Sequence, residues 1–230
     1  MADATLARAG TDRWRSGRRR GDRSTGRASV GGRPFDRFAA FVAILGAVAV
    51  IVANLVAAWL HPTTGLFADT ISNLAAGRYH WILDAALVVF ALGMVMVALA
   101  MWDMHLEGWR WRIGAALIGL SGFAIAVIAL YNEYGDNDTG GLVIHLEVVV
   151  AMALAFAAGA ILLSLGLTRI GSGWSAFSLW CGIGWLALGL AFFFLASDAW
   201  DGLVERLAAG LMVLWSLGMA RLVGRERYPD

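Results

Sequence analysis

Long apolar runs alternate with short polar connections along the chain. A helix of about 20 apolar residues can cross a ~30 Å hydrocarbon layer, and each run has about this length. The pattern predicts transmembrane helices at about 38–60, 81–101, 111–131, 143–167, 177–196 and 204–223. The expected fold is therefore all-α, a polytopic bundle of six spans.

Composition excludes a soluble globular domain. The chain has 230 residues, of which 60% are hydrophobic and 15% are charged. Soluble domains are typically about 45–50% apolar. The lipid bilayer is therefore the first partner that the sequence predicts. The single cysteine, Cys181, lies inside an apolar run, so it can form no internal disulfide and belongs to no cysteine-based metal motif.

The segment before the first run is rich in arginine, glycine and serine. Ten of the 18 basic residues lie in residues 1–37, and all 18 are arginine. Such a segment buries too little apolar surface to fold, so we expect residues 1–37 to form a disordered cytoplasmic tail that touches anionic lipid. A nucleic-acid-binding arm is the alternative that we do not favour. The predicted membrane domain covers residues 38–224, and 225–230 form a short cytoplasmic end.

The distribution of arginine predicts the orientation in the membrane. With a cytoplasmic N-terminus, 16 of the 18 arginines fall in or beside cytoplasmic segments, and only Arg78 and Arg206 fall outside. Cytoplasmic segments of membrane proteins carry such an excess of basic residues. We therefore expect a multi-pass protein of a prokaryotic plasma membrane with both termini in the cytoplasm.

Polar residues collect at the extracytoplasmic ends of the predicted spans. We expect the first loop, 61–80, to fold over these ends as a lid, with Arg206 as the counter-charge. His80 and Asp84 are four residues apart and so share one face of a helix. The predicted cluster consists of His61, Asp69, Ser72, His80, Asp84, His145, Glu147, Glu205 and Arg206.

This cluster has a structural and a chemical interpretation. In the first, an ion pair joins the last span to its neighbours and the histidines bind loop carbonyl groups. In the second, His80, Asp84 and His145 hold zinc, since neutral imidazole and carboxylate are zinc ligands and a bound metal can activate water. Ser72 and Asp69 are weak catalytic candidates, because either residue could instead cap a short interfacial helix. No local H-x-x-x-H or H-E-x-x-H motif supports the metal site.

Two segments and one histidine resemble a known family. They are "TISNLAAGRYHWILDAALVVFALGM" (70–94), "GLVERLAAGLMVLWSLGMARL" (202–222) and His145 at the start of the fourth span. Together they look like the domain-of-unknown-function 998 family over about residues 38–224. The resemblance implies a six-helix prokaryotic membrane protein without an established activity. The matching positions are Ser72, Leu74, His145, Gly202, Leu203 and Arg206.

The chain departs from this family pattern at two places. No proline follows the third span, and Glu205 stands where glutamine is common. We expect an integral membrane protein that is structural, accessory or lipid-binding, and we favour such a role over an enzymatic one. The alternatives are a metal-dependent lipid hydrolase, distantly similar to alkaline-ceramidase-like enzymes, and an ion- or proton-coupled carrier. Small residues at helical spacing, as at Ala49, Ala53 and Ala57, predict close helix contacts and allow a homo-oligomer.

Overall fold

The computed structural model describes residues 33–60, 67–75, 79–106, 108–131, 144–195 and 199–225, and the predicted site residue His61 lies outside these ranges. Helices are the only regular elements in the described part of the chain. They are α1 (Pro34–Leu60), α2 (Ile71–Ala75), α3 (His80–Met104), α4 (Trp109–Leu130), α5 (His145–Leu167), α6 (Ser172–Phe194) and α7 (Asp201–Val223). All except the short α2 are long and apolar enough to cross a membrane. This confirms the all-α fold with six spans.

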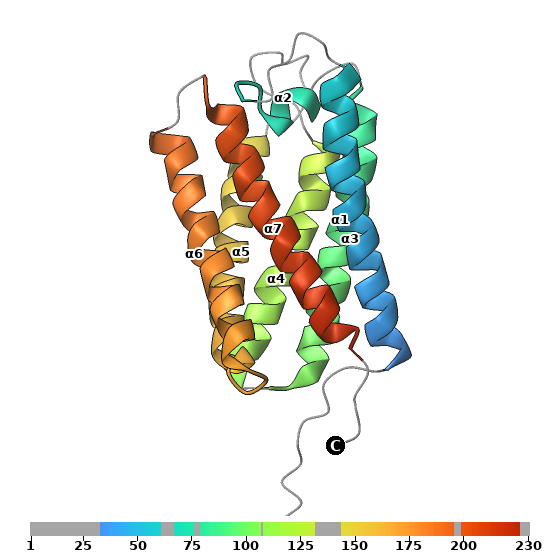
Figure 1. Ribbon diagram of the computed structural model, residues 1–230, viewed down its shortest axis with the longest axis vertical. Helices are drawn as coiled ribbons and strands as arrows, with labels where there is room; N and C mark the ends of the chain where they lie inside the picture. The colour runs from blue at the N-terminus through green and yellow to red at the C-terminus, as the bar shows by residue number, and fades with distance from the viewer. Residues whose placement is uncertain are drawn as a thin grey trace, which may run out of the picture.

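The spans form a closed ring. The helix α1 packs against α3 and α7, and α4, α5 and α6 follow α3 in chain order back to α7. Figure 1 shows α2 at one end of the bundle, which we call the loop end. The described chain begins at Arg33 and stops at Arg225. Both residues lie at the end of the bundle opposite α2, which we call the termini end. Ring closure therefore places the first and last spans side by side.

Five of the six spanning helices begin before the apolar runs that predicted them. The first helix begins at Pro34, where a proline at the first helical position loses no hydrogen bond. The fifth span, α6, begins at Ser172 and not at 177, because polar residues can continue a helix into the interfacial region. Hydropathy thus locates the membrane-crossing part of a helix, whereas its ends depend on local backbone chemistry.

Glycine allows the α1 and α3 backbones to touch. A Cβ atom on Gly46 would lie 2.6 Å from Cα of Phe90, and one on Gly93 would lie 2.7 Å from Cα of Ala43. The predicted small-residue stripe continues this contact, since Ala53 and Ala57 are buried. Close backbone approach of this kind stabilises helix pairs in lipid, where burial of apolar surface gives no net driving force.

Aromatic side chains fill the interior between α5, α6 and α7. The ring of Phe156 packs edge-to-face on Trp185 and Trp215, with centroid distances of 5.3 and 5.5 Å. Trp215 Nε1 donates a 3.0 Å hydrogen bond to Ser178 Oγ, which donates to the Ala160 carbonyl at 2.7 Å. These bonds satisfy polar atoms away from water and connect the three helices.

Candidate functional site at the loop end

The segment before α2 lies directly on the first turn of α7. The Leu203 amide donates a 2.9 Å hydrogen bond to the Phe67 carbonyl. The Phe67 ring packs edge-to-face on Trp200 at a centroid distance of 6.0 Å. A Cβ atom on Gly202 would lie 2.2 Å from the carbonyl oxygen of Asp69. Only glycine at this position therefore permits the observed approach of the loop.

Glu205 uses both carboxylate oxygens to hold the start of α2. The Ile71 amide donates to Oε2, and the Ser72 hydroxyl donates to Oε1 at 2.9 Å. Amides in the first turn of a helix have no partner within that helix. Glu205 supplies one of the missing acceptors from α7, so α2 is capped by a different helix as well as by its own residues.

The local cap of α2 includes Thr70, which the sequence analysis did not name. Thr70 Oγ1 accepts a 3.0 Å hydrogen bond from the Asn73 amide. A short helix is present where the sequence predicted one, and the two residues named as its caps both bond to α7. Asp69 does so through its backbone carbonyl and Ser72 through its hydroxyl.

Arg206 connects the loop to α1 and α7. Its Nη1 donates to the Asp69 carbonyl at 2.6 Å and to the Gly202 carbonyl at 3.0 Å. Its Nε donates to Asn54 Oδ1 at 3.3 Å. Gly202, Glu205 and Arg206 thus act on one short segment, and we call these three residues the loop clamp.

The remaining predicted site residues in the described part of the chain belong to α3 and α5. His80 Nδ1 is 2.7 Å from Asp84 Oδ2 on α3, and the His80 side chain is 53% exposed. His145 is buried at the start of α5, where it hydrogen-bonds to the backbone of Tyr131. Glu147 is exposed. In the ring, α4 stands between α3 and α5, and a single cluster of all these residues stays a prediction.

The proposed zinc ligands do not converge in the described residues. Among those residues, no group of three or more His, Cys, Asp or Glu side chains is placed to hold a metal ion. His80 and Asp84 are neighbours, but His145 belongs to the α4–α5 side of the ring. A catalytic zinc site usually has three protein ligands.

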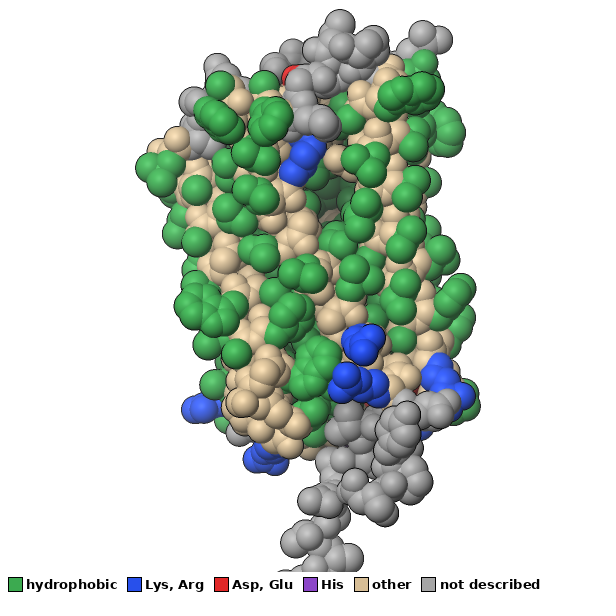
Figure 2. Space-filling model, viewed as in Figure 1, with side chains coloured by type: hydrophobic (Ala, Val, Ile, Leu, Met, Phe, Trp, Pro, Cys, Tyr) green, Lys and Arg blue, Asp and Glu red, His purple; other side chains and the backbone are tan. Residues whose placement is uncertain are grey.

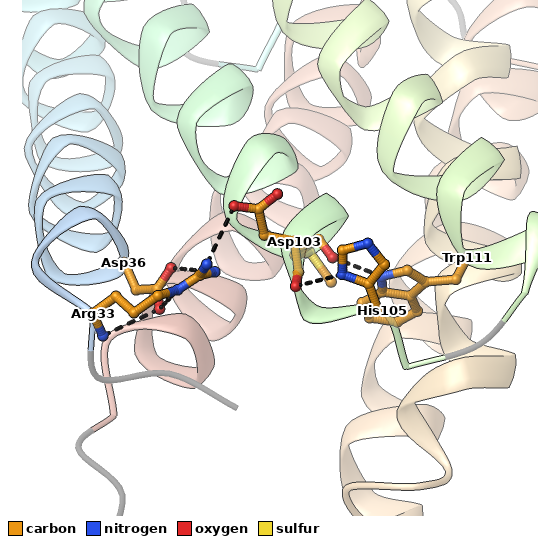
Figure 3. Close-up of polar contacts among 6 residues, drawn as sticks. Arg33, Asp36, Asp103, His105 and Trp111 are labelled. Atoms are coloured by element: carbon orange, nitrogen blue, oxygen red, sulfur yellow. Dashed lines mark hydrogen bonds and ion pairs between the residues drawn. The ribbon is translucent and has the colours of Figure 1, made fainter. Parts of the chain in front are cut away.

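A second polar network, at the termini end, was not predicted. The Arg33 guanidinium contacts Asp36 at 3.2 Å and Asp103 at 3.4 Å, and so joins α1 to α3 (Figure 3). Asp36 is only 3% exposed. The hydrogen bond and charge of Asp36, with a smaller effect of Asp103, hold the pKa of Arg33 above its ordinary value. The sequence signal that could have indicated this network was Asp36, an acid in the first turn of an apolar helix. The first turn of a helix favours negative charge.

Comparison with known proteins identifies the family without supplying an activity. The model of a family described as protein of unknown function (DUF998) matches residues 44–222. No curated protein and no solved structure matches the chain. The match covers all of α3 to α6, together with most of α1 and α7 and the whole loop clamp. The chain therefore belongs to the DUF998 family of proteins of unknown function.

Proposed function

We propose that this integral membrane protein is a structural or accessory component of the bilayer and that the loop clamp is a fixed closure of its outer face. One observation carries the proposal. Both oxygens of Glu205 and two nitrogens of Arg206 are already used to hold the segment from Asp69 to Ser72 and its neighbours. Polar groups that are fully engaged in this way rigidify a structure.

The contacts of Ser72 favour this function over lipid hydrolysis. A nucleophilic serine needs a neighbouring base that is free to take its proton. The Ser72 hydroxyl donates to Glu205, whose other oxygen accepts the Ile71 amide. His145, the buried histidine, bonds to the backbone of Tyr131 at the end of α4 instead. The arrangement supports a role for Ser72 in positioning the loop.

Removal of the Glu205 carboxylate is expected to open the loop. The probe is Ala75→Cys in a Cys181→Ala background, because Ala75 at the end of α2 is 5% exposed and Cys181 is the only native cysteine. Glu205→Ala leaves the Ile71 amide and the Ser72 hydroxyl without their acceptor, which costs about 1–3 kcal/mol. We expect the rate of labelling by an impermeant maleimide to rise about tenfold or more.

Asp201→Ala is the matched control for this experiment. Asp201 is another acid in the first turn of α7, and its replacement leaves the two hydrogen bonds to Glu205 intact. Labelling of the control should equal that of the parent. Equal labelling of the Glu205→Ala protein would show that the clamp does not hold the loop. Near-stoichiometric zinc in the purified protein, lost in His145→Ala, would instead favour the metal-dependent hydrolase.

We further propose that the termini end faces the cytoplasm of a prokaryotic cell and that the bilayer is the plasma membrane. Of the eight arginines in the described residues, seven belong to the termini end and only Arg206 to the loop end. The positive-inside rule favours this orientation. A green fluorescent protein fused to the C-terminus should fluoresce, whereas a C-terminal alkaline phosphatase should be inactive. An active phosphatase fusion would reverse the proposed orientation.

A further inference from the structure

Two grooves flank the last turns of α7 at the termini end. The first lies between α6 and α7, has a volume of about 480 Å³ and is walled by apolar side chains such as Trp174 and Phe177. The second lies between α1 and α7, has a volume of about 560 Å³ and includes Phe41 and Ile44. Arg221 lines both grooves, so they share one wall and one cation.

Positive charge is concentrated where the two grooves meet. Arg37 and Arg225 line the second groove in addition to Arg221. The Arg225 guanidinium lies 5.3 Å from the centroid of the Trp174 ring, which lines the first groove. Within the described chain, no acidic side chain lines either groove. Figure 2 shows basic side chains gathered at this lower end of the bundle, below a largely apolar surface.

This combination fits one class of ligand. Apolar grooves between membrane-spanning helices are open to acyl chains, and arginine is well suited to phosphate because its guanidinium can donate two parallel hydrogen bonds. Basic pockets between transmembrane helices bind anionic lipid headgroups. A headgroup without net charge would leave the positive charge of Arg221 and Arg225 uncompensated. The site therefore selects for an anionic lipid.

We propose that the termini end binds one anionic diacyl phospholipid, with its phosphate on Arg221 and Arg225 and one acyl chain in each groove. The lipid straddles the end of α7 and joins α1 to α6. The site lies at the opposite end of the bundle from the loop clamp, so it does not depend on the function proposed for that clamp.

The test is native mass spectrometry of the full-length protein, released from nanodiscs that contain equal amounts of phosphatidylglycerol and phosphatidylcholine. The wild type should retain one phosphatidylglycerol per chain. Arg221→Gln combined with Arg225→Gln should reduce that retention by on the order of tenfold, because each arginine near an anionic headgroup contributes measurably to binding. Arg110→Gln combined with Arg112→Gln is the matched control. These two arginines lie at the same end and also stand over tryptophan rings, at 5.6 and 5.8 Å.

A second pair of variants tests the groove without changing charge. A Cβ atom on Gly173, which lines the first groove, would meet nothing within 4 Å, so Gly173→Phe can fill the groove and preserve the helix contacts. Gly189→Phe on the same helix is its control, since a Cβ atom there is also unobstructed. Gly173→Phe should lose phosphatidylglycerol and Gly189→Phe should keep it. Three results would each overturn the proposal. The wild type could retain the two lipids equally, the double arginine variant could retain as much phosphatidylglycerol as the wild type, or the wild type could be released as a dimer without lipid.

Discussion

Gly202→Ala is expected to separate the α2 loop from α7 and to lower the stability of the bundle. The added Cβ atom would lie 2.2 Å from the Asp69 carbonyl oxygen and 2.8 Å from Nη1 of Arg206. The Asp69 carbonyl belongs to the backbone, so the whole segment must move, and the hydrogen bonds to Leu203 and Arg206 lengthen with it. Overpacking of this kind costs about 1–3 kcal/mol. The measurement is the midpoint of thermal unfolding in detergent, followed by tryptophan fluorescence.

Gly210→Ala is the control for this substitution. Gly210 lies on the same helix, and a Cβ atom there would meet nothing within 4 Å. Because alanine has the higher helix propensity by about 1 kcal/mol, the control should be neutral or slightly more stable. A Gly202→Ala protein as stable as the control would mean that the loop does not pack on α7 at this distance.

Gly46→Val is expected to have the largest effect on the fold. A Cβ atom on Gly46 would lie 2.6 Å from the Cα atom of Phe90 and 2.8 Å from the Val89 carbonyl oxygen. Both contacts are with backbone, so no side-chain rotation can relieve them, and α1 must move away from α3. We expect a loss of about 3 kcal/mol or more. The yield of monodisperse protein after extraction and its unfolding midpoint measure this loss.

Gly189→Val provides the reference for Gly46→Val. The substitution is the same, it is also made inside a spanning helix, and a Cβ atom on Gly189 is unobstructed. Its effect should stay within about 0.5 kcal/mol. If both variants unfold at the same temperature, the α1–α3 contact is looser than described.

Hydrophobic run length was sufficient to predict the fold. A span that faces lipid needs about 20 apolar residues regardless of its neighbours, so each helix could be recognised by itself. The small-residue stripe at Ala53 and Ala57 was also readable, because helical spacing alone determines which residues share a face. Neither property depends on which helix lies next to which.

Hydropathy could not predict which residues meet at the loop end, because it does not reveal the order of the helices in the ring. Ser72, Glu205 and Arg206 lie together at one end of the bundle, whereas the sequence led us to expect Ser72 and Asp69 to face His80, Asp84, His145 and Glu147. The ring order puts α7 beside α1, and it puts α5 on the far side of α4. The loop clamp also acts mainly on backbone atoms, namely the Phe67 and Asp69 carbonyls and the Ile71 amide. A side-chain pattern cannot reveal such contacts.

The loop clamp also has a consequence for biosynthesis. The segment that it holds follows α1, but the residues that hold it belong to α7, which leaves the ribosome after α3, α4, α5 and α6. The loop end therefore stays open while the four spans from α3 to α6 are inserted, and it closes only when α7 arrives. A chain that stops before α7 would expose the unpaired amides of α2, and quality-control proteases could distinguish it from the finished protein by that loop.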